Sequence, residues 1–345
     1  MNKISLTGMN LTELQEVVFS LGGSKFRAVQ IYNGIYLKSY KSFDDMTDLP
    51  ISFRELLKEK YTLSDVILED KQISSDGTMK FLFKLPDGNV TEAVLMRFDN
   101  RANLTACISS QVGCPMACSF CATAKLGFKR NLNTDEILKQ IYLIQADTGL
   151  KVTNIVFMGQ GEPLLNLDNV LEAIKRLRED FKIGSRRITV STCGIIPGIK
   201  RLAEIKFQPT VAISLHSADS EKRAEIMPVE KKYKIKDVIS ELRKLTLVTG
   251  RRVTIEYILI KGINDSIKDA KNLCELISQL KCNVNLIIYN ENEYCKYKKP
   301  LKEDILKFKC IVEASGKKVT IRLERGADID AACGQLSAKY KNGHG

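Results

Sequence analysis

Three cysteines lie close together in the segment QVGCPMACSFCATAKLGF, as Cys114, Cys118 and Cys121. Ten cysteines in 345 residues would produce this spacing by chance roughly 0.008 times per chain. Cysteine thiolates bind zinc or iron–sulfur clusters. Structural zinc prefers four ligands in paired knuckles, but the next cysteine here is Cys193. A three-thiolate site leaves one coordination position of a metal open, and an iron–sulfur cube held by three cysteines has one iron free to bind a substrate.

A glycine-rich turn, Met158-Gly159-Gln160-Gly161-Glu162-Pro163, follows a predicted strand. Its backbone carbonyls and the Glu162 carboxylate can accept hydrogen bonds from an ammonium group. Taken alone, such a turn is more typical of an ordinary loop. Polar residues also end or follow later predicted strands, at Ser191, Ser214-Leu215-His216 and Asn290.

Two further cysteines stand apart from the group of three. Cys107 lies seven residues before Cys114, inside a predicted strand, and Cys333 lies near the C-terminus in RGADIDAACGQL. Small neighbours leave the Cys333 thiol accessible, so its segment could deliver it to a nearby site. Single cysteines are usually buried small apolar side chains. That interpretation is applied to Cys193, Cys274, Cys282, Cys295 and Cys310.

The elements that must position these residues alternate from about residue 104 onward. Apolar runs predict strands over 104–110, 152–159, 186–192, 210–216, 252–260, 284–289 and 318–323. Helical periodicity between them predicts helices over 134–147, 167–180, 235–248, 266–280 and 302–315. Strand–helix alternation indicates parallel βαβ units and an α/β barrel, open or closed, whose chemistry lies on loops after strand ends. The three-cysteine loop follows the first of these strands.

The first hundred residues differ from the rest. Residues 1–60 predict three helices, with Gly22-Gly23 ending the first and Leu49-Pro50 preceding the third. Residues 65–96 alternate polar and apolar side chains and carry turn signals at Asp76-Gly77 and Asp87-Gly88, which predicts a β meander.

Composition narrows the class of protein. Apolar residues make up 44% of the chain and charged residues 27%, as in a globular domain rather than a disordered chain. The sequence lacks a continuous apolar run of the ~20 residues that a membrane span needs. The N-terminal stretch has no apolar signal segment, and cysteines are sparse, so we expect a reducing cytoplasmic location and no membrane partner. A net charge of +12 favours a nucleic-acid partner.

The cysteine spacing, with Phe120 before the last cysteine, resembles the radical S-adenosylmethionine (SAM) superfamily. Longer strings resemble the RlmN/Cfr family, RlmN more closely than Cfr: ACISSQVGC, CSFCATAKLGFKRNL, GEPLLN, ISLHSADSEKRAEIMP, EYILIKGINDS and GADIDAACGQL. The resemblance implies a partial (β/α)6-type radical SAM barrel with a small N-terminal helical accessory domain and a β extension. It divides the chain into 1–62 (RNA-binding accessory domain), 63–100 (β-hairpin extension or linker), 101–325 (barrel) and 326–345 (C-terminal segment with the methyl-accepting cysteine).

The resemblance also implies an activity, the methylation of an adenosine in 23S rRNA. RlmN-like members act on adenine C2 and on the adenosine 3′ of the anticodon in tRNAs, whereas Cfr-like members act on C8. Adenine C2 is electron-poor and cannot attack the SAM methyl group as a nucleophile. A first SAM would therefore methylate the Cys333 thiolate. A second SAM, cleaved to a 5′-deoxyadenosyl radical, would take hydrogen from that methyl group.

The family's site residues carry over onto this chain by motif. Cys114, Cys118 and Cys121 would hold a [4Fe–4S] cluster. Gly161, Glu162, Ser191, Ser214, Leu215, His216 and Asn290 would bind SAM. Glu92 would accept the ring proton. Cys107 would attack the Cys333 sulfur, forming a disulfide and releasing the methylated base.

The resemblance also implies partners, and the chain differs from the family's common pattern at two positions. An electron donor such as flavodoxin or ferredoxin and a monomeric state are expected. Family members commonly have Met where this chain has Gln160, and Pro where it has Ile288. RNA phosphates are expected to meet basic residues on loops and strand ends: Lys125, Lys129, Arg130, Arg186, Arg187, Lys231, Lys232, Arg251, Arg252, Lys317, Lys318, Arg322 and Arg325. Three alternatives stay open. They are a Cfr-like adenine-C8 rRNA methyltransferase that gives antibiotic resistance, a non-catalytic Fe–S or zinc RNA-binding module, and another kind of radical SAM enzyme.

Overall fold

A computed structural model describes residues 3–97, 103–291, 295–322, 325–332 and 334–336. Its centre is one ten-stranded sheet in the order β14-β13-β12-β11-β10-β9-β6-β5-β4-β3. The strands are β3 (Ile67–Ile73), β4 (Met79–Lys84), β5 (Val90–Arg97), β6 (Leu104–Ile108), β9 (Asn154–Phe157), β10 (Ile188–Thr192), β11 (Thr210–Ser214), β12 (Val253–Leu259), β13 (Cys282–Ile288) and β14 (Val319–Arg322). The strands from β6 to β14 in this order are parallel, and β3, β4 and β5 continue the sheet antiparallel.

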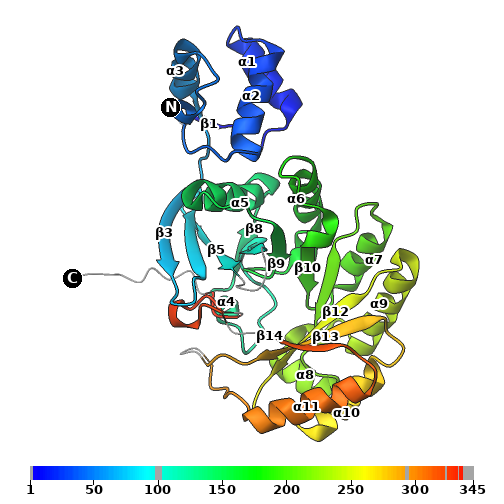
Figure 1. Ribbon diagram of the computed structural model, residues 1–345. Coiled ribbons are helices and arrows are strands. Elements are labelled where there is room, and N and C mark those ends of the chain that lie inside the picture. Colours follow the sequence, from blue (N-terminus) through cyan, green and yellow to red (C-terminus); the bar gives the residue numbers. More distant parts are fainter. Residues whose placement is uncertain (1–2, 98–102, 292–294, 323–324, 333, 337–345) are drawn as a thin grey trace, which may run out of the picture.

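Helices surround the curved sheet on its outer side (Figure 1). They are α5 (Thr134–Thr148), α6 (Leu167–Glu179), α7 (Ile196–Glu204), α8 (Ser220–Ile226), α9 (Ile235–Thr249), α10 (Ile267–Leu276) and α11 (Lys302–Ala314). Each of the first six parallel strands is followed by at least one helix, and β14 closes the series. The predicted partial barrel is confirmed, with every predicted strand and helix of this region present within a few residues.

Helices α7 and α8 were missed by the sequence reasoning. Helix α7 begins at Ile196, directly before Pro197 and Gly198, which are usually loop signals. The α8 segment SEKRAEI is short and mostly charged, so it carries little apolar periodicity. Helix α7 does have an apolar side, with Ile199 and Leu202 buried, so its proline and glycine concealed a pattern that the sequence contains.

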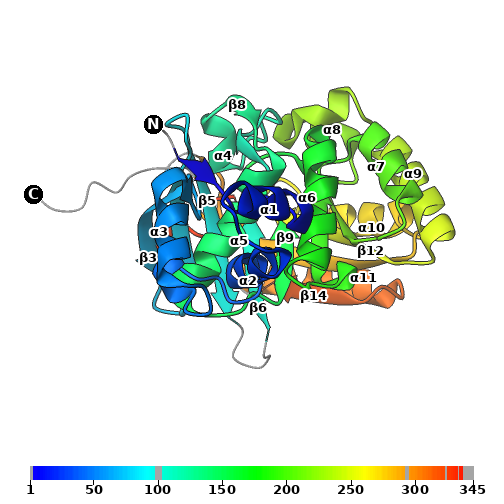
Figure 2. The same cartoon turned by 90° about the horizontal axis from the view of Figure 1, so that it is seen from above.

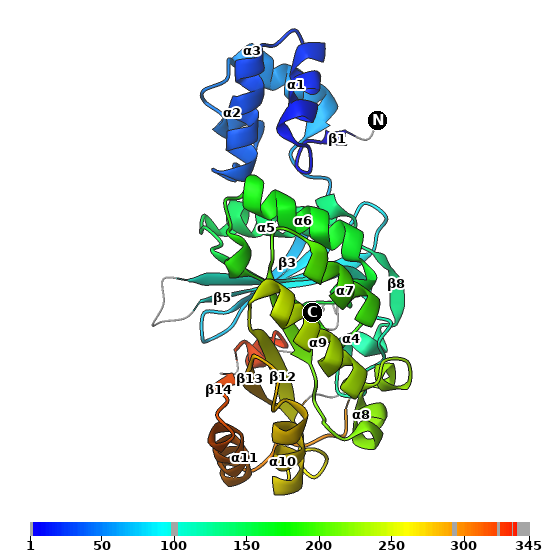
Figure 3. The same cartoon turned by 90° about the vertical axis from the view of Figure 1, so that its right-hand side faces the viewer.

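The N-terminal helices α1 (Leu11–Ser20), α2 (Lys25–Tyr36) and α3 (Ile51–Lys60) form a unit beyond α5 and α6 (Figures 2 and 3). The sequence did not predict the parallel pair of β1 (Ile4–Ser5) with β2 (Tyr61–Thr62) that ties its two ends together. The Arg176 guanidinium on α6 donates to the backbone oxygens of Gly8 and Met9 at 2.7 and 2.9 Å. Tyr32 on α2 donates to Asp180 at 2.5 Å, so the unit is docked through polar contacts.

Two apolar clusters lie on opposite faces of the sheet near β5 and β6. The main core lies under the helices and includes Ala93, Leu95 and Ile108. Residues two apart on a strand share a face, and on the other face Val94 and Cys107 cluster with Met96, Ala331 and Leu336. The C-terminal segment thus covers the inner face of the sheet, where the candidate site lies. Among the described residues, no helix has the length and apolar character needed to cross a bilayer.

Candidate active site

The three-cysteine loop lies at the C-terminal end of β6, as the barrel rule predicts. It leaves the short strand β7 (Gln111–Gly113) and returns through α4 (Ala122–Lys125) to β8 (Phe128–Asn131). A single cavity, here called the loop cavity, has most of the predicted site residues in its wall. They are Cys114, Cys118, Cys121, Gly161, Glu162, Ser191, Ser214 and His216. Leu215 is buried beside this wall rather than part of it.

The chemistry of the three thiols fits a cluster. Burial raises the pKa of Cys114 to about 12 and that of Cys118 well above its ordinary value, with neighbouring thiols adding to both shifts. These thiols are therefore protonated until a metal replaces the proton. In a [4Fe–4S] cube, each of three thiolates would bind a separate iron, which leaves the fourth iron open.

Backbone contacts from distant segments hold the loop. The Ser119 N–H donates to the Ile226 carbonyl at 3.0 Å, and the Ala122 N–H donates to the Gly334 carbonyl at 2.7 Å. Ala117, between Cys114 and Cys118, has a φ of +54°, a conformation that is costly for a residue with a Cβ. The surrounding contacts keep the loop in this strained shape.

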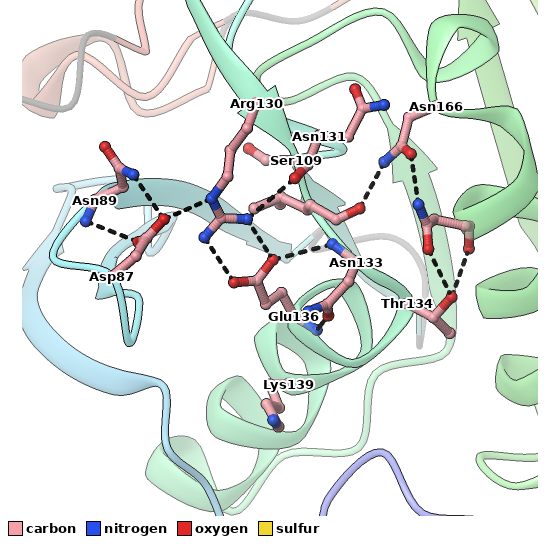
Figure 4. A network of polar contacts seen from close by, with 12 residues as sticks. Asp87, Asn89, Ser109, Arg130, Asn131, Asn133, Thr134, Glu136, Lys139 and Asn166 are labelled. Carbon is pink, nitrogen blue, oxygen red and sulfur yellow. Dashed lines mark hydrogen bonds and ion pairs between the residues drawn. The ribbon is translucent and has the colours of Figure 1, made fainter.

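A polar network anchors the base of the loop to α5 (Figure 4). Arg130 on β8 makes two hydrogen bonds of 2.8 Å to Glu136 and one of 2.6 Å to Asp87. The Asn166 amide donates at 2.7 Å to the carbonyls of both Ser110 and Leu132. Bidentate arginine–carboxylate pairs are directional, so the network fixes where the loop leaves the sheet.

The glycine-rich turn is shaped first by the protein itself. A Cβ on Gly159 would lie 2.7 Å from the Ile108 carbonyl oxygen, and one on Gly161, where φ is +102°, would lie 2.6 Å from the Gln111 Cβ. We expected these glycines to allow a ligand to approach. The structure shows a more local reason, since both glycines let the turn pack against the ends of β6 and β7.

Glu162 is buried in the wall of the loop cavity. Its carboxylate accepts hydrogen bonds from the Leu164 N–H at 3.0 Å and from the Cys193 N–H at 2.8 Å. Burial raises its pKa despite these bonds. The N–H groups orient a carboxylate that is available to a cationic group in the cavity.

His216 is a fixed, neutral wall residue. Its Nδ1 accepts a hydrogen bond of 3.0 Å from the Ile258 N–H, which leaves the proton on Nε2. Burial, together with the charge of Arg223, lowers its pKa to about 3. The φ of +58° and an edge-on contact with Phe120 at 5.1 Å hold the ring in place. The residue can therefore donate from Nε2 but not exchange protons near neutral pH.

The sequence reasoning missed part of the wall. Met116, Thr192, Cys193, Met227, Glu256, Ile258 and Arg322 also line the loop cavity. Glu256 is buried on β12 and accepts a hydrogen bond from the Asn285 amide at 3.0 Å. Its other carboxylate oxygen has no hydrogen-bond partner among the residues that the structure describes. The sequence feature that could have identified Glu256 is the presence of an acidic residue inside the apolar run RVTIEYILI. Cys193 is buried as predicted, but Cys310 is exposed, against our expectation.

A second cavity, here called the C-terminal cavity, adjoins the first. Cys107 lines it with Val94 and Met96 of β5 and with residues of the C-terminal segment, Ala331, Ala332, Gly334 and Leu336. Met158, Ile287, Arg322, Gly334 and Leu336 belong to both walls. Asn290, assigned from the resemblance to SAM, lines this second cavity. Cys333 lies outside the described residues.

Glu92 lies within β5, where it pairs with Leu82 of β4. Val94 is paired with Cys107, and β5 runs antiparallel to β6, so Glu92 is two residues closer to the loop on the same face. Its carboxylate is buried, 3.8 Å from the Lys80 amine and 3.3 Å from the Gln160 amide. It is in the wall of neither cavity as formed by the described residues.

Several basic residues expected to meet RNA phosphates bind other parts of the protein. Arg130 is paired as described, and Arg322 lines both cavities. Lys317 donates to the Leu280 carbonyl at 2.9 Å, and Arg251 donates to the Gln208 carbonyl. The prediction that these residues contact RNA phosphates stays a prediction.

Comparison with known proteins identifies families that match two parts of the chain. Residues 108–274 match the radical SAM superfamily, and residues 4–63 match the ribosomal RNA large subunit methyltransferase N-terminal domain. The "Probable dual-specificity RNA methyltransferase RlmN" of Alkaliphilus oremlandii is 45% identical, covering 99% of both chains. The protein of that name from Thermotoga neapolitana is 44% identical, covering 98% of both chains.

A solved structure extends the agreement to three dimensions. The crystal structure of a radical SAM methyltransferase from Sphaerobacter thermophilus has a TM-score of 0.91 and 39% identity, and the match covers 97% of this chain and 100% of that one. Membership of the radical SAM superfamily implies a [4Fe–4S] cluster and SAM. The chain belongs to the RlmN family of radical SAM RNA methyltransferases.

Proposed function

We propose that the chain methylates C2 of an adenosine in 23S rRNA and of the adenosine 3′ of the anticodon in tRNAs, through an S-methylcysteine on Cys333. The relatives' name, dual-specificity RNA methyltransferase, supports two RNA substrates. The observation that carries the proposal is the pair of adjoining cavities. One contains the three cluster cysteines, and the other has Cys107 beside residues that flank Cys333 in the chain.

In this proposal, Cys114, Cys118 and Cys121 hold the [4Fe–4S] cluster. Glu162 accepts hydrogen bonds from the amino group of SAM, and Gly161, Ser191, Ser214, Leu215, His216 and Asn290 complete the SAM site. When bound, the cluster and SAM supply the methyl group and the one-electron chemistry that removes a hydrogen atom from it. Two SAM molecules are used per turnover, with electrons from a donor such as flavodoxin or ferredoxin.

The chain's own residues carry the methyl group to RNA. The Cys333 thiolate takes the methyl group by displacement. Once a hydrogen atom is removed, that carbon adds to electron-poor C2. The radical adduct loses its one unpaired electron, which a bound [4Fe–4S] cluster in its oxidised state would accept, and Glu92 takes the ring proton. The Cys107 thiolate then attacks the Cys333 sulfur, forming the S–S bond as the S–C bond breaks. The bonding pair leaves with the carbon and, with a proton, completes the methyl group.

Isotope mapping tests the proposal. The enzyme is reconstituted anaerobically and given SAM with a deuterated methyl group and a reductant, without RNA. Trypsin cleavage after Arg325 and Lys339 should release a peptide that contains Cys333, and we expect the label on that cysteine. SAM cleavage with unlabelled Cys333 would indicate another type of radical SAM enzyme, and absence of SAM cleavage would indicate a binding module.

Nucleoside analysis of treated RNA tests the position. We expect 2-methyladenosine in 23S rRNA and in tRNA. Exclusive formation of 8-methyladenosine would show a Cfr-like enzyme instead. Size measurement of the reconstituted enzyme tests the expected monomer.

A further inference from the structure

We infer that Gln160 is a positioning residue that holds the Glu92 carboxylate in place for transfer of the ring proton. The inference rests on the proposed role of Glu92. It assigns a purpose to the side chain in the middle of the glycine-rich turn, a position where this chain departs from the family's common methionine.

The side chain of Gln160 is held at both ends. It is only 1% exposed. Its Nε2 donates to the Glu92 carboxylate at 3.3 Å, and its Oε1 accepts from the Thr91 hydroxyl at 3.3 Å. A carboxylate only accepts hydrogen bonds, so the amide must direct its nitrogen toward Glu92. The two contacts therefore define one orientation of the amide.

The backbone of Gln160 is equally constrained. Its N–H donates to the Ser109 hydroxyl at 2.8 Å, and that hydroxyl donates to the Glu92 carbonyl oxygen at 2.6 Å. Its carbonyl accepts from the Ser110 N–H at 2.9 Å. The turn, the end of β6 and the start of β5 are thus joined through both main chain and side chain.

The turn connects the two parts of the reaction. Glu162, two residues after Gln160, lines the loop cavity, and Glu92 lies on the β5 face that leads to Cys107. A shift of the turn would therefore move a SAM-site group and the proposed proton acceptor together. Gly159 and Gly161, pressed against β6 and β7, leave Gln160 as the side chain between them.

The charges around Glu92 suit an acceptor. The Lys80 amine, from β4, faces the carboxylate at 3.8 Å in buried surroundings, and Gln160 approaches from the turn after β9. From β6, the Ser109 hydroxyl bonds to the backbone of Glu92 rather than to its carboxylate. Donors to the charged form favour ionisation. The Gln160 amide thus helps to keep Glu92 able to take a proton.

The test separates the two methyl transfers. The loaded enzyme is first methylated on Cys333, and transfer to RNA is then followed in a single turnover between pH 6 and pH 9. We expect Gln160→Met, of similar size but without a donor, to slow this second transfer roughly three- to tenfold. The acidic limb of its pH profile should move to higher pH, while methylation of Cys333 and iron content stay at the wild-type level.

The matched control is Thr91→Val, which removes the other partner of the Gln160 amide and keeps the bond to Glu92. We expect a change of less than about twofold and no shift in the pH profile. An equal slowing in both variants without a pH shift, or loss of Cys333 methylation in Gln160→Met, would overturn the inference. It would show that the turn only maintains the fold.

Glu92→Gln distinguishes this inference from the proposed function. If that variant still methylates RNA at the wild-type rate, the proposed role of Glu92 is wrong and the inference falls with it. If Glu92→Gln is inactive in the second transfer while Gln160→Met matches the wild type at every pH, only the inference is wrong.

Discussion

The two cavities share five wall residues but are built differently. The loop cavity is lined by thiols, carboxylates and a neutral histidine, and hydrogen bonds to strand ends and to α5 hold its parts in place. The C-terminal cavity is lined by strand side chains and by a segment at the end of the chain. The described residues of that segment are bonded to two other parts of the chain. Thr123 donates to the Leu336 carbonyl at 2.7 Å, and Ser74 donates to Asp328 at 2.5 Å.

The difference suggests a division of labour. A cofactor that is cleaved by one-electron chemistry needs a site with fixed geometry, because misplacement by about 1 Å can cost roughly a hundredfold in rate. In the proposed function, the thiol that receives the methyl group is carried by the segment that lines the C-terminal cavity. The predictions below test whether changes in one cavity leave the other intact.

The largest contrast is expected between Cys118→Ser and Cys107→Ser. The first variant should lose the cluster, and with it both methylation of Cys333 and transfer to RNA. The second should keep the cluster and Cys333 methylation but fail to release the product, leaving protein joined to RNA. Iron analysis, peptide mass spectrometry and a denaturing gel measure these outcomes. Loss of iron in Cys107→Ser would contradict the separation of the two cavities.

The next effect concerns Glu256, whose second carboxylate oxygen lacks a partner in the loop cavity. SAM offers hydrogen-bond donors that could fill this position. Glu256→Gln should weaken SAM binding roughly tenfold, as expected for a lost bond to a charged group. Equilibrium dialysis with the oxidised cluster measures affinity without turnover. Unchanged affinity would show that the carboxylate serves the fold and not the cofactor.

A smaller effect concerns pH and His216. Its folded pKa of about 3 lies below the ordinary value of 6.5, so between these values the unfolded chain binds a proton that the folded chain does not. Stability therefore falls as pH drops below 6.5, by about 2 kcal/mol at pH 5. His216→Asn, which keeps an acceptor for Ile258, should lack this contribution.

Urea unfolding of both proteins at pH 7.5 and pH 5, under anaerobic conditions, tests the His216 prediction. Glu162 and Glu256 have raised pKa values and act in the opposite direction, so the difference between wild type and variant is the relevant quantity. The same pH dependence in both proteins would show that His216 is not the titrating group.

The smallest effect is expected outside the cavity walls, at Arg130. Arg130→Met removes the pairs with Glu136 and Asp87 and should lower the free energy of unfolding by about 1 kcal/mol, since the guanidinium is partly solvated. Arg130→Lys keeps the charge and should recover part of it. Both variants should still methylate Cys333. A loss of cluster in Arg130→Met with retention in Arg130→Lys would show that the network sets the loop geometry more strongly than its stability.

The sequence predicted most of the fold because the barrel repeats a local pattern. Apolar strands such as 252–260 and amphipathic helices such as 302–315 carry their own periodicity. It failed for α8, where charged residues conceal the buried side, and for the β1–β2 pair, which joins strands more than fifty residues apart. A short helix or strand has too few residues to show a clear apolar periodicity, so its charged or polar residues dominate the prediction.

The sequence by itself predicted the cysteine motif, because Cys114, Cys118 and Cys121 are close in the chain and their spacing is rare by chance. The Gly–Glu–Pro turn became informative only beside that motif. Only the tertiary structure decided that Glu256 belongs to the loop cavity and that Gln160 and Lys80 meet at Glu92. Those contacts depend on which strands become neighbours. Strand order is fixed by packing of the whole sheet, and no local pattern records it.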